Sequence, residues 1–304
     1  SLQAVVSHQS LENLFLGTFP VLAPPPTLSG SEWADEYFYL SSESSHQAGK
    51  WKTLPYQRGI LDAVTDPLVE KISVQKSTRV GYTKILNIIL SYHIHQDPCP
   101  ILLVQPTVED AEGYSKEELS PMLRDVPVLR GLIKEQKAKD GNNTILKKIF
   151  PGMILHLIGA NSPRGFRRIT VRKSLLDEID GYPPSAGEEG DQYKLATRRT
   201  DYAWNRQIIA GSTPTFKDRS RIERLYREGD QRHFYVPCPF CGGMQYLKWE
   251  NFDWQDKGTI DNPVYVCEHC SEAIDYSHHR AMMEAGEWRA HADFKGHASF
   301  HIWA

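Results

Sequence analysis

Residues 76–84 have the types and spacing that phosphate binding requires. The run Lys76-Ser-Thr-Arg-Val-Gly-Tyr-Thr-Lys84 follows an apolar segment and precedes another. The usual phosphate loop is GxxxxGK[ST] between a strand and a helix, but here Lys76 takes the first glycine position and Tyr82 the lysine position. N–H groups that open a helix still bind phosphate, Lys76 could fold back onto the β- and γ-phosphates, and Thr83 could hold Mg²⁺. An ordinary strand, turn and helix with surface cations explains the segment equally well.

Two adjacent carboxylates, Asp177 and Glu178, end an apolar run that begins at Val171. In phosphate-loop NTPases the first carboxylate of such a pair holds Mg²⁺, and a glutamate after it polarises the attacking water. A pair that merely caps a strand end is the alternative. Because the pair follows a candidate phosphate loop at a suitable distance, the nucleotide interpretation is favoured.

Basic and hydroxyl residues flank this carboxylate strand. An arginine of the turn-rich run 159–168 could stabilise charge on a transferred phosphoryl group, from the same subunit or a neighbour; a solvated loop and a DNA contact are equally open. Beyond the apolar run 207–210, Ser212 and Thr213 could sense the γ-phosphate, although a simple Gly/Pro turn also fits.

An adenine-binding signal lies upstream, in Leu54-Pro-Tyr-Gln-Arg58. The amide of Gln57 offers the donor and acceptor that an adenine edge needs, and Tyr56 could stack on the base. Taken alone the signal is weak, because Tyr56 is equally well explained as a core aromatic.

Four of the five cysteines form two CxxC pairs, Cys238 with Cys241 and Cys267 with Cys270. This spacing predicts a closed four-thiolate Zn²⁺ site with a structural role and no open catalytic position. His269, inside the second pair, is an alternative ligand. Cys99 stands alone, and we expect an unpaired thiol.

The elements that must position these residues alternate along the chain. Strand-like runs occur at 72–75, 101–105, 153–158, 174–176 and 207–210, and helical stretches at 83–96 and 108–124. This order predicts an α/β fold with a mainly parallel central sheet and flanking helices. A charged stretch at 217–232 reads as helical, 233–275 as a small metal-stapled subdomain, and 298–303 as a terminal strand.

Composition bounds the class of protein. The 304 residues carry 35 Lys and Arg against 38 Asp and Glu, a net charge of −3, which excludes a globally basic nucleic-acid binder but not a local basic patch. The longest nearly apolar stretch, 85–94, is too short for a membrane span. No secretory signal is visible, and the odd cysteine count fits a reducing compartment.

Taken together, these segments closely resemble the large terminase subunit of lambda-type tailed phages, the motor that packages viral DNA into a prohead. The resemblance is carried by residues 32–40, 51–58, 76–84, 176–178, 211–214, 238–241 and 300–303, in the family's order over nearly the whole chain. A lysine at the first position of the phosphate loop is itself characteristic of that family.

The resemblance implies a role for each matching residue and a phosphate-loop NTPase fold of the RecA/ASCE type with a small zinc-ribbon-like subdomain. Tyr56 and Gln57 fall on the adenine motif, and Ser212 and Thr213 on the coupling motif. Asp177 would be the magnesium carboxylate and Glu178 the catalytic one, with Arg167 the best match to the family's arginine and Arg164 a rival. The deviant phosphate loop comprises Lys76, Ser77, Thr78, Arg79, Val80, Gly81, Tyr82, Thr83 and Lys84.

We therefore expect an Mg²⁺-dependent ATPase that translocates double-stranded DNA in the host cytoplasm. The expected partners are DNA, the small terminase subunit and the portal or prohead, with an active homo-oligomeric ring. Cations at Arg164, Arg167, Arg168, Arg172 and Lys173, and others in 217–232, could grip DNA. The alternatives are a helicase-like ATPase and a zinc-ribbon DNA-binding or assembly module with a degenerate nucleotide site.

Three segments are expected: an N-terminal arm, linker and lead-in helix (1–49), the ATPase domain (50–232), and the zinc-binding segment with the terminal strand (233–304). The family's C-terminal nuclease domain has no match here, so we expect the motor portion only.

Overall fold

The computed structural model describes residues 27–45, 48–132, 143–215 and 219–302. Its centre is a ten-stranded sheet in the order β10-β9-β15-β3-β8-β7-β4-β6-β5, with β14 also paired to β9. Neighbours from β9 to β6 run parallel, and β5, β10 and β14 add antiparallel edges. The strands are β3 (Lys71–Lys76), β4 (Ile101–Gln105), β5 (Lys147–Phe150), β6 (Met153–Gly159), β7 (Lys173–Asp177), β8 (Gln207–Ser212), β9 (Arg232–Pro237), β10 (Met244–Tyr246), β14 (Glu287–Arg289) and β15 (His297–Ile302).

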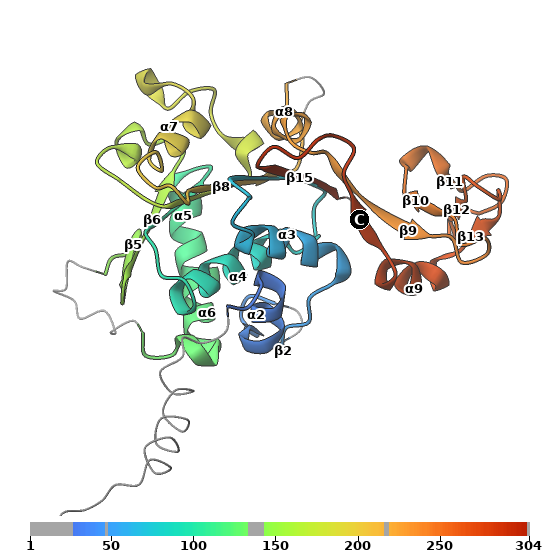
Figure 1. Ribbon diagram of the computed structural model, residues 1–304, viewed down its shortest axis with the longest axis horizontal. Coiled ribbons are helices and arrows are strands. Elements are labelled where there is room, and N and C mark those ends of the chain that lie inside the picture. Colours follow the sequence, from blue (N-terminus) through green and yellow to red (C-terminus); the bar gives the residue numbers. More distant parts are fainter. Residues whose placement is uncertain (1–26, 46–47, 133–142, 216–218, 303–304) are drawn as a thin grey trace, which may run out of the picture.

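Helices cover both faces of this sheet (Figure 1). Along β4, Ile101 and Leu103 face one core, whereas Leu102 and Val104 face the other, the alternation that a strand's period of two dictates. Apolar side chains on both faces explain why the central strands read as continuous hydrophobic runs. The helices are α2 (Gly30–Tyr37), α3 (Pro55–Thr65), α4 (Tyr82–His95), α5 (Val108–Tyr114), α6 (Ser120–Asp125), α7 (Gln192–Arg198), α8 (Arg221–Glu228) and α9 (His279–Glu284).

The predicted α/β class is confirmed, and every predicted central strand is present. The helix expected over 108–124 consists of α5, a π-helical turn (Ser115–Leu119) and α6. The helix expected over 217–232 is shorter in the structure, where α8 comprises Arg221–Glu228. It begins after Ser220, whose side chain accepts the N–H of Glu223, and ends at Gly229, after which the chain enters β9; residues 217 and 218 lie outside the described ranges.

Residues 238–286, which we call the zinc unit, extend from the β9 end of the sheet (Figure 1). Their three-stranded sheet comprises β11 (Phe252–Asp253), β12 (Val264–Val266) and β13 (Ala273–Ile274). A small core joins Tyr265, Ile274 and Met282 to side chains of β9. Because this core is small, the unit needs a further constraint such as a metal.

The terminal strand is not part of the zinc unit. We expected it to group with that segment, but β15 pairs in parallel with β3 and β9 inside the central sheet. Phe300 and Ile302 are buried in the main core. The division of the chain at 232/233 therefore remains a proposal, and β9 and β15 belong to the central sheet.

Toward the N-terminus, β1 (Tyr39–Leu40) and β2 (Gly49–Lys50) form a short hairpin, and α2 packs on the main core through Trp33. The arm expected over residues 1–26 lies outside the described residues. No helix in the described ranges combines the length and apolar character that crossing a membrane requires.

Candidate active site

The loop between β3 and α4 has the backbone form of an anion-binding turn. Arg79 and Gly81 have positive φ angles of 66° and 80°, and Gly81 is the N-cap of α4. The Ser77 N–H donates to the carbonyl of Ile302, 3.0 Å away. In the first turn of α4 the Lys84 N–H already donates to the Gly81 carbonyl at 3.0 Å, so the N–H groups of Tyr82 and Thr83 are those that a helix start offers to phosphate.

Lys76, the last residue of β3, forms an ion pair with Glu178. The lysine side chain is 7% exposed, and its Nζ lies 5.4 Å from the centroid of the Tyr82 ring. The lysine that sequence reasoning placed at the phosphates and the glutamate placed at the attacking water thus meet, although 102 positions separate them.

Tyr82 fills the position of the usual lysine by burying its ring under β8. A Cβ added to Gly211 would lie 2.1 Å from the ring's Cζ, so only glycine leaves room for the tyrosine. Burial, and then the charges of Asp177 and Glu178, raise the pKa of the Tyr82 hydroxyl well above its ordinary value. Tyr82 is therefore a core residue, and the primary amine beside its ring belongs to Lys76.

Asp177 ends β7 as a buried carboxyl. Its Oδ2 accepts a hydrogen bond from Gln105 Nε2 at 3.1 Å, from the end of neighbouring β4. Burial, with a contribution from Glu178, raises the pKa of Asp177 to about 6, against the opposing effects of Gln105 and Lys76. A carboxylate at this position suits Mg²⁺, which prefers oxygen ligands; the role of Thr83 as a second ligand remains a prediction. Sequence reasoning missed Gln105; its position after a buried strand was the available signal.

Glu178 contacts the predicted coupling residues. Its Oε2 accepts from Ser212 Oγ and from the Thr213 N–H, both at 3.2 Å. The glutamate has a φ of 48°, which is unusual for a residue other than glycine. Lys76, Glu178, Ser212 and Thr213 thus meet at the carboxyl edge of three parallel strands, where α/β folds bind ligands.

Lys84 is held by other groups. Its Nζ lies 2.6 Å from Glu118 Oε2 and 2.9 Å from Ser44 Oγ. Asn87 donates to the same Glu118 oxygen at 2.8 Å. A contact between Lys84 and phosphate therefore remains a prediction, and it would require this network to open.

Gln57 lies against the phosphate loop, and Tyr56 lies against β9 and β14. Gln57 accepts the Leu54 N–H at 3.0 Å and donates to the Val80 carbonyl at 3.4 Å. Tyr56 is half-buried, and its carbonyl accepts from Trp288 Nε1 at 3.0 Å. The ring of Tyr56 packs on Phe234, which supports its interpretation as a core aromatic, and its contact with adenine remains a prediction.

The two candidate arginines are on the surface. Arg167 pairs with Glu189 at 2.5 Å with its side chain 64% exposed, and Arg164 is exposed on a 3-10 turn. In the described part of the chain, neither arginine forms a hydrogen bond or ion pair with Lys76 or Glu178. Their exposure fits a charge offered to a neighbouring subunit, which remains a prediction.

Two of the cations proposed to grip DNA are structural instead. Lys173 is 6% exposed and donates to Gln207 Oε1 at 2.9 Å and to the Val64 carbonyl at 3.3 Å. Arg172 pairs with Asp97. The structure gives no support to DNA contact by Lys173, because a phosphate cannot reach a buried amine, and the Arg172 guanidinium, 16% exposed, is already engaged by Asp97. Arg164, Arg167 and Arg168 remain exposed.

Four thiols gather in the zinc unit as the spacing predicts. The Sγ atoms of Cys238, Cys241, Cys267 and Cys270 lie within 4.8 Å of one another. The Cys238–Cys270 distance is 3.8 Å and the Cys241–Cys267 distance 3.9 Å. A tetrahedral site with Zn–S bonds of about 2.3 Å separates its sulfurs by about 3.8 Å, so the cluster fits Zn²⁺.

The two other candidates, His269 and Cys99, do not belong to the thiol cluster. The Nε2 of His269 lies 3.1 Å from the Met244 carbonyl, so this histidine is engaged outside the thiol cluster. Cys99 is buried near the start of β4, and burial raises its pKa to about 11.

Known proteins match this arrangement. Residues 45–288 fit the family described as "Phage terminase large subunit gpA, ATPase domain". The chain belongs to this family. It is 34% identical over 261 residues to the terminase large subunit of Enterobacteria phage P21, covering 83% of this chain and 40% of that protein. The corresponding protein of Escherichia phage lambda is 32% identical over 277 residues, covering 87% and 43%.

The terminase chain thus spans about two fifths of the length of these curated relatives. Among solved structures, the large terminase ATPase domain of Thermus phage P74-26 aligns with a TM-score of 0.46 and 12% sequence identity. The alignment covers 84% of this chain and 82% of that one.

Proposed function

We propose that this chain is the ATP-hydrolysing motor portion of a terminase that moves double-stranded DNA into a prohead. The observation that carries the proposal is the Lys76–Glu178 ion pair beside Asp177 and the Ser212–Thr213 turn. Phosphoryl-transfer sites combine a lysine, two carboxylates and hydroxyl side chains, and these groups meet here at the carboxyl edge of parallel strands.

In this mechanism Lys76 exchanges one anion for another. With ATP bound, its ammonium turns from Glu178 to the β- and γ-phosphates, and the N–H groups of residues 78–83 bind the same oxygens. Freed of the lysine, the Glu178 carboxylate orients the attacking water and accepts its proton. Asp177 and Thr83 would hold Mg²⁺, which supplies charge neutralisation when bound. Because Ser212 and Thr213 bind the Glu178 carboxylate at the end of β8, a movement of Glu178 would shift this strand end.

Further roles follow from position. Tyr56 and Gln57 would bind adenine beside the phosphate loop, which requires the Gln57 amide to release the Leu54 N–H or the Val80 carbonyl. Arg167, or Arg164, would meet γ-phosphate charge across a ring interface. Exposed Arg164, Arg167 and Arg168 would also be available to DNA. The small terminase subunit and the portal or prohead are the proposed protein partners, and the proposed location is the host cytoplasm.

The zinc unit is an unsuitable DNA grip by its charge. Within 238–286, eight carboxylates stand against three lysines and arginines. Lys248 pairs with Glu268 at 2.6 Å and Arg280 with Glu284 at 2.9 Å. Because DNA binding depends on cations that can replace counterions, we assign this unit a structural role.

The principal test is ATP turnover with Lys76→Ala and Glu178→Ala. We expect both variants to keep the parent's melting temperature within a few degrees and to lose at least about 100-fold in kcat. Lys295→Ala, at an exposed position outside the site, is the matched control and should retain full turnover. Parent-like turnover in both site variants would refute the mechanism.

A nucleotide titration separates the proposal from the assembly-module alternative, which Tyr82 at the lysine position first suggested. We expect saturable Mg·ATP binding that Lys76→Ala weakens. A parent chain that binds no ATP would favour the assembly module.

A further inference from the structure

Glu178 is held in a strained backbone conformation at the start of the segment 179–184. The left-handed φ of 48° at a glutamate costs about 1 kcal/mol or more. Such a conformation persists only when surrounding contacts over-determine it. The contacts around residues 179–184 therefore decide where the Glu178 carboxylate lies.

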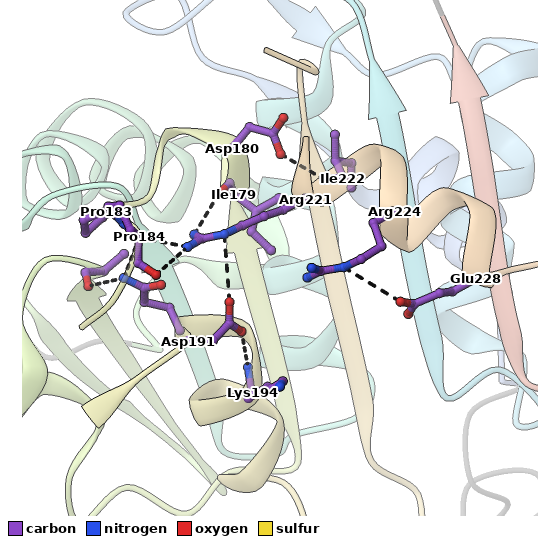
Figure 2. A network of polar contacts seen from close by, with 12 residues as sticks. Ile179, Asp180, Pro183, Pro184, Asp191, Lys194, Arg221, Ile222, Arg224 and Glu228 are labelled. Carbon is purple, nitrogen blue, oxygen red and sulfur yellow. Dashed lines mark hydrogen bonds and ion pairs between the residues drawn. The ribbon is translucent and has the colours of Figure 1, made fainter. Parts of the chain in front are cut away.

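Arg221, the first residue of α8, supplies the largest group of these contacts (Figure 2). Its Nη2 donates to the carbonyls of Pro183 at 2.9 Å and Pro184 at 3.1 Å, and its Nη1 to that of Ile179 at 3.5 Å. Asp191 lies 3.9 Å from its Nε, and the side chain is only 16% exposed. A planar guanidinium with five donors is the side chain that can bind several carbonyls at once.

Asp180 ties the same two elements together from the other side. Its carboxylate accepts the N–H of Ile222 at 2.9 Å and that of Thr215 at 3.1 Å. Its own N–H donates to Ser212 Oγ at 3.2 Å, and this hydroxyl in turn donates to Glu178 Oε2. Asp180 thus links α8 to Glu178: its carboxylate binds the N–H of Ile222 in α8, and its N–H binds the Ser212 hydroxyl that contacts Glu178.

Helix α8 also packs on β3, the strand that ends in Lys76. One element therefore contacts the supports of both members of the Lys76–Glu178 pair. We propose that Arg221 is a positioning residue for ATP hydrolysis, which holds the segment 179–184 on α8 so that Glu178 stays aligned when Lys76 leaves it. This inference rests on the proposed function.

The test compares Arg221→Ala with Arg224→Ala, one turn along the same helix. Arg224 is a suitable control because its side chain is 59% exposed and lies 3.9 Å from Glu228, away from the segment (Figure 2). We expect Arg221→Ala to lower kcat about tenfold or more while the KM for ATP and the affinity for a non-hydrolysable ATP analogue change less than about twofold. Arg221→Lys should recover part of the loss, and Arg224→Ala should match the parent.

A cycle with Glu178→Gln separates positioning from general damage. If Arg221 acts through Glu178, adding Arg221→Ala to Glu178→Gln costs little further activity. The same fold-loss in both backgrounds, or unchanged turnover in Arg221→Ala, would overturn the inference while leaving the ATPase assignment intact. Absence of turnover in the parent chain would overturn the proposed function, and the inference with it.

Discussion

At the scale of single residues, the unusual phosphate loop results from a physical exchange. A tyrosine takes the position of the usual lysine and is buried under Gly211, while a lysine at the end of β3 supplies the amine. The two changes depend on each other, because Lys76 reaches Glu178 over the face of the same ring. Compared with the usual phosphate-loop sequence, Lys76 and Tyr82 are two departures. In the structure they are coupled, because the tyrosine that replaces the usual lysine packs beside the lysine that replaces the usual glycine.

Gly211→Ala tests this pairing. The added methyl would lie 2.1 Å from the Tyr82 ring, so we expect the free energy of unfolding to fall by about 1–3 kcal/mol and ATP affinity to fall with it. Gly113→Ala is the control, because its Cβ meets nothing within 4 Å in helix α5 and should stabilise by up to about 1 kcal/mol. Urea unfolding measures both; equal stability of Gly211→Ala and the parent would contradict the packing argument.

At the scale of elements, the local hydrophobic pattern of the sequence predicts the central strands and α4. The central strands are predicted because residues such as Ile101 to Val104 form short, wholly apolar runs, and α4 is predicted because the apolar run 85–90 follows the candidate phosphate loop. Contacts distant in sequence had no such signal. Gln105 meets Asp177 across 72 positions, and β15 enters between β3 and β9 only through tertiary pairing. The same limit hid the contact between Arg221 and the segment after Glu178.

The zinc unit gives an element-scale prediction. We expect one Zn²⁺ per chain, and a strong chelator or Cys267→Ser should remove it and unfold residues 238–286, because thiolate sites supply folding free energy to small units. Strand β9 should keep its hydrogen-exchange protection, since it also pairs with β15. Cys99→Ser, which changes a thiol outside the cluster, should retain the metal.

Metal content and hydrogen exchange, measured on the same samples, report the two effects separately. Loss of zinc without loss of protection in β12 and β13 would show that the metal has no folding role.

At the scale of the whole molecule, the near-neutral total charge is the sum of an acidic region and a basic one. The zinc unit is acidic, whereas exposed Arg164, Arg167 and Arg168 lie close together before the carboxylate strand. Burial removes Lys173 from the cations that can bind DNA. The composition therefore excludes only a globally basic nucleic-acid binder and does not locate a local basic patch.

Replacing these three arginines with alanine should weaken binding to duplex DNA. We expect the slope of log K against log salt to shrink by up to about 0.9 for each lost phosphate contact. Arg280→Ala in the zinc unit, where Arg280 already pairs with Glu284, should leave the slope unchanged. Fluorescence anisotropy over a salt series measures this, and identical slopes for the triple variant and the parent would move the grip elsewhere.

Acid lability is the last whole-molecule prediction. Burial lowers the pKa values of His93 and His297 to about 4, with nearby Lys173 and Lys71 adding to the effect. An unfolded histidine takes up its proton near pH 6.5, so between pH 6.5 and 4 the unfolded chain binds more protons, and stability must fall as the pH falls. We expect urea midpoints to drop across this window, with a partial offset from Asp177, whose raised pKa of about 6 makes the folded chain take up a proton there. His93→Gln should flatten the slope by about one proton; a midpoint constant from pH 6.5 to 4 would show that these imidazoles are protonated in the folded chain.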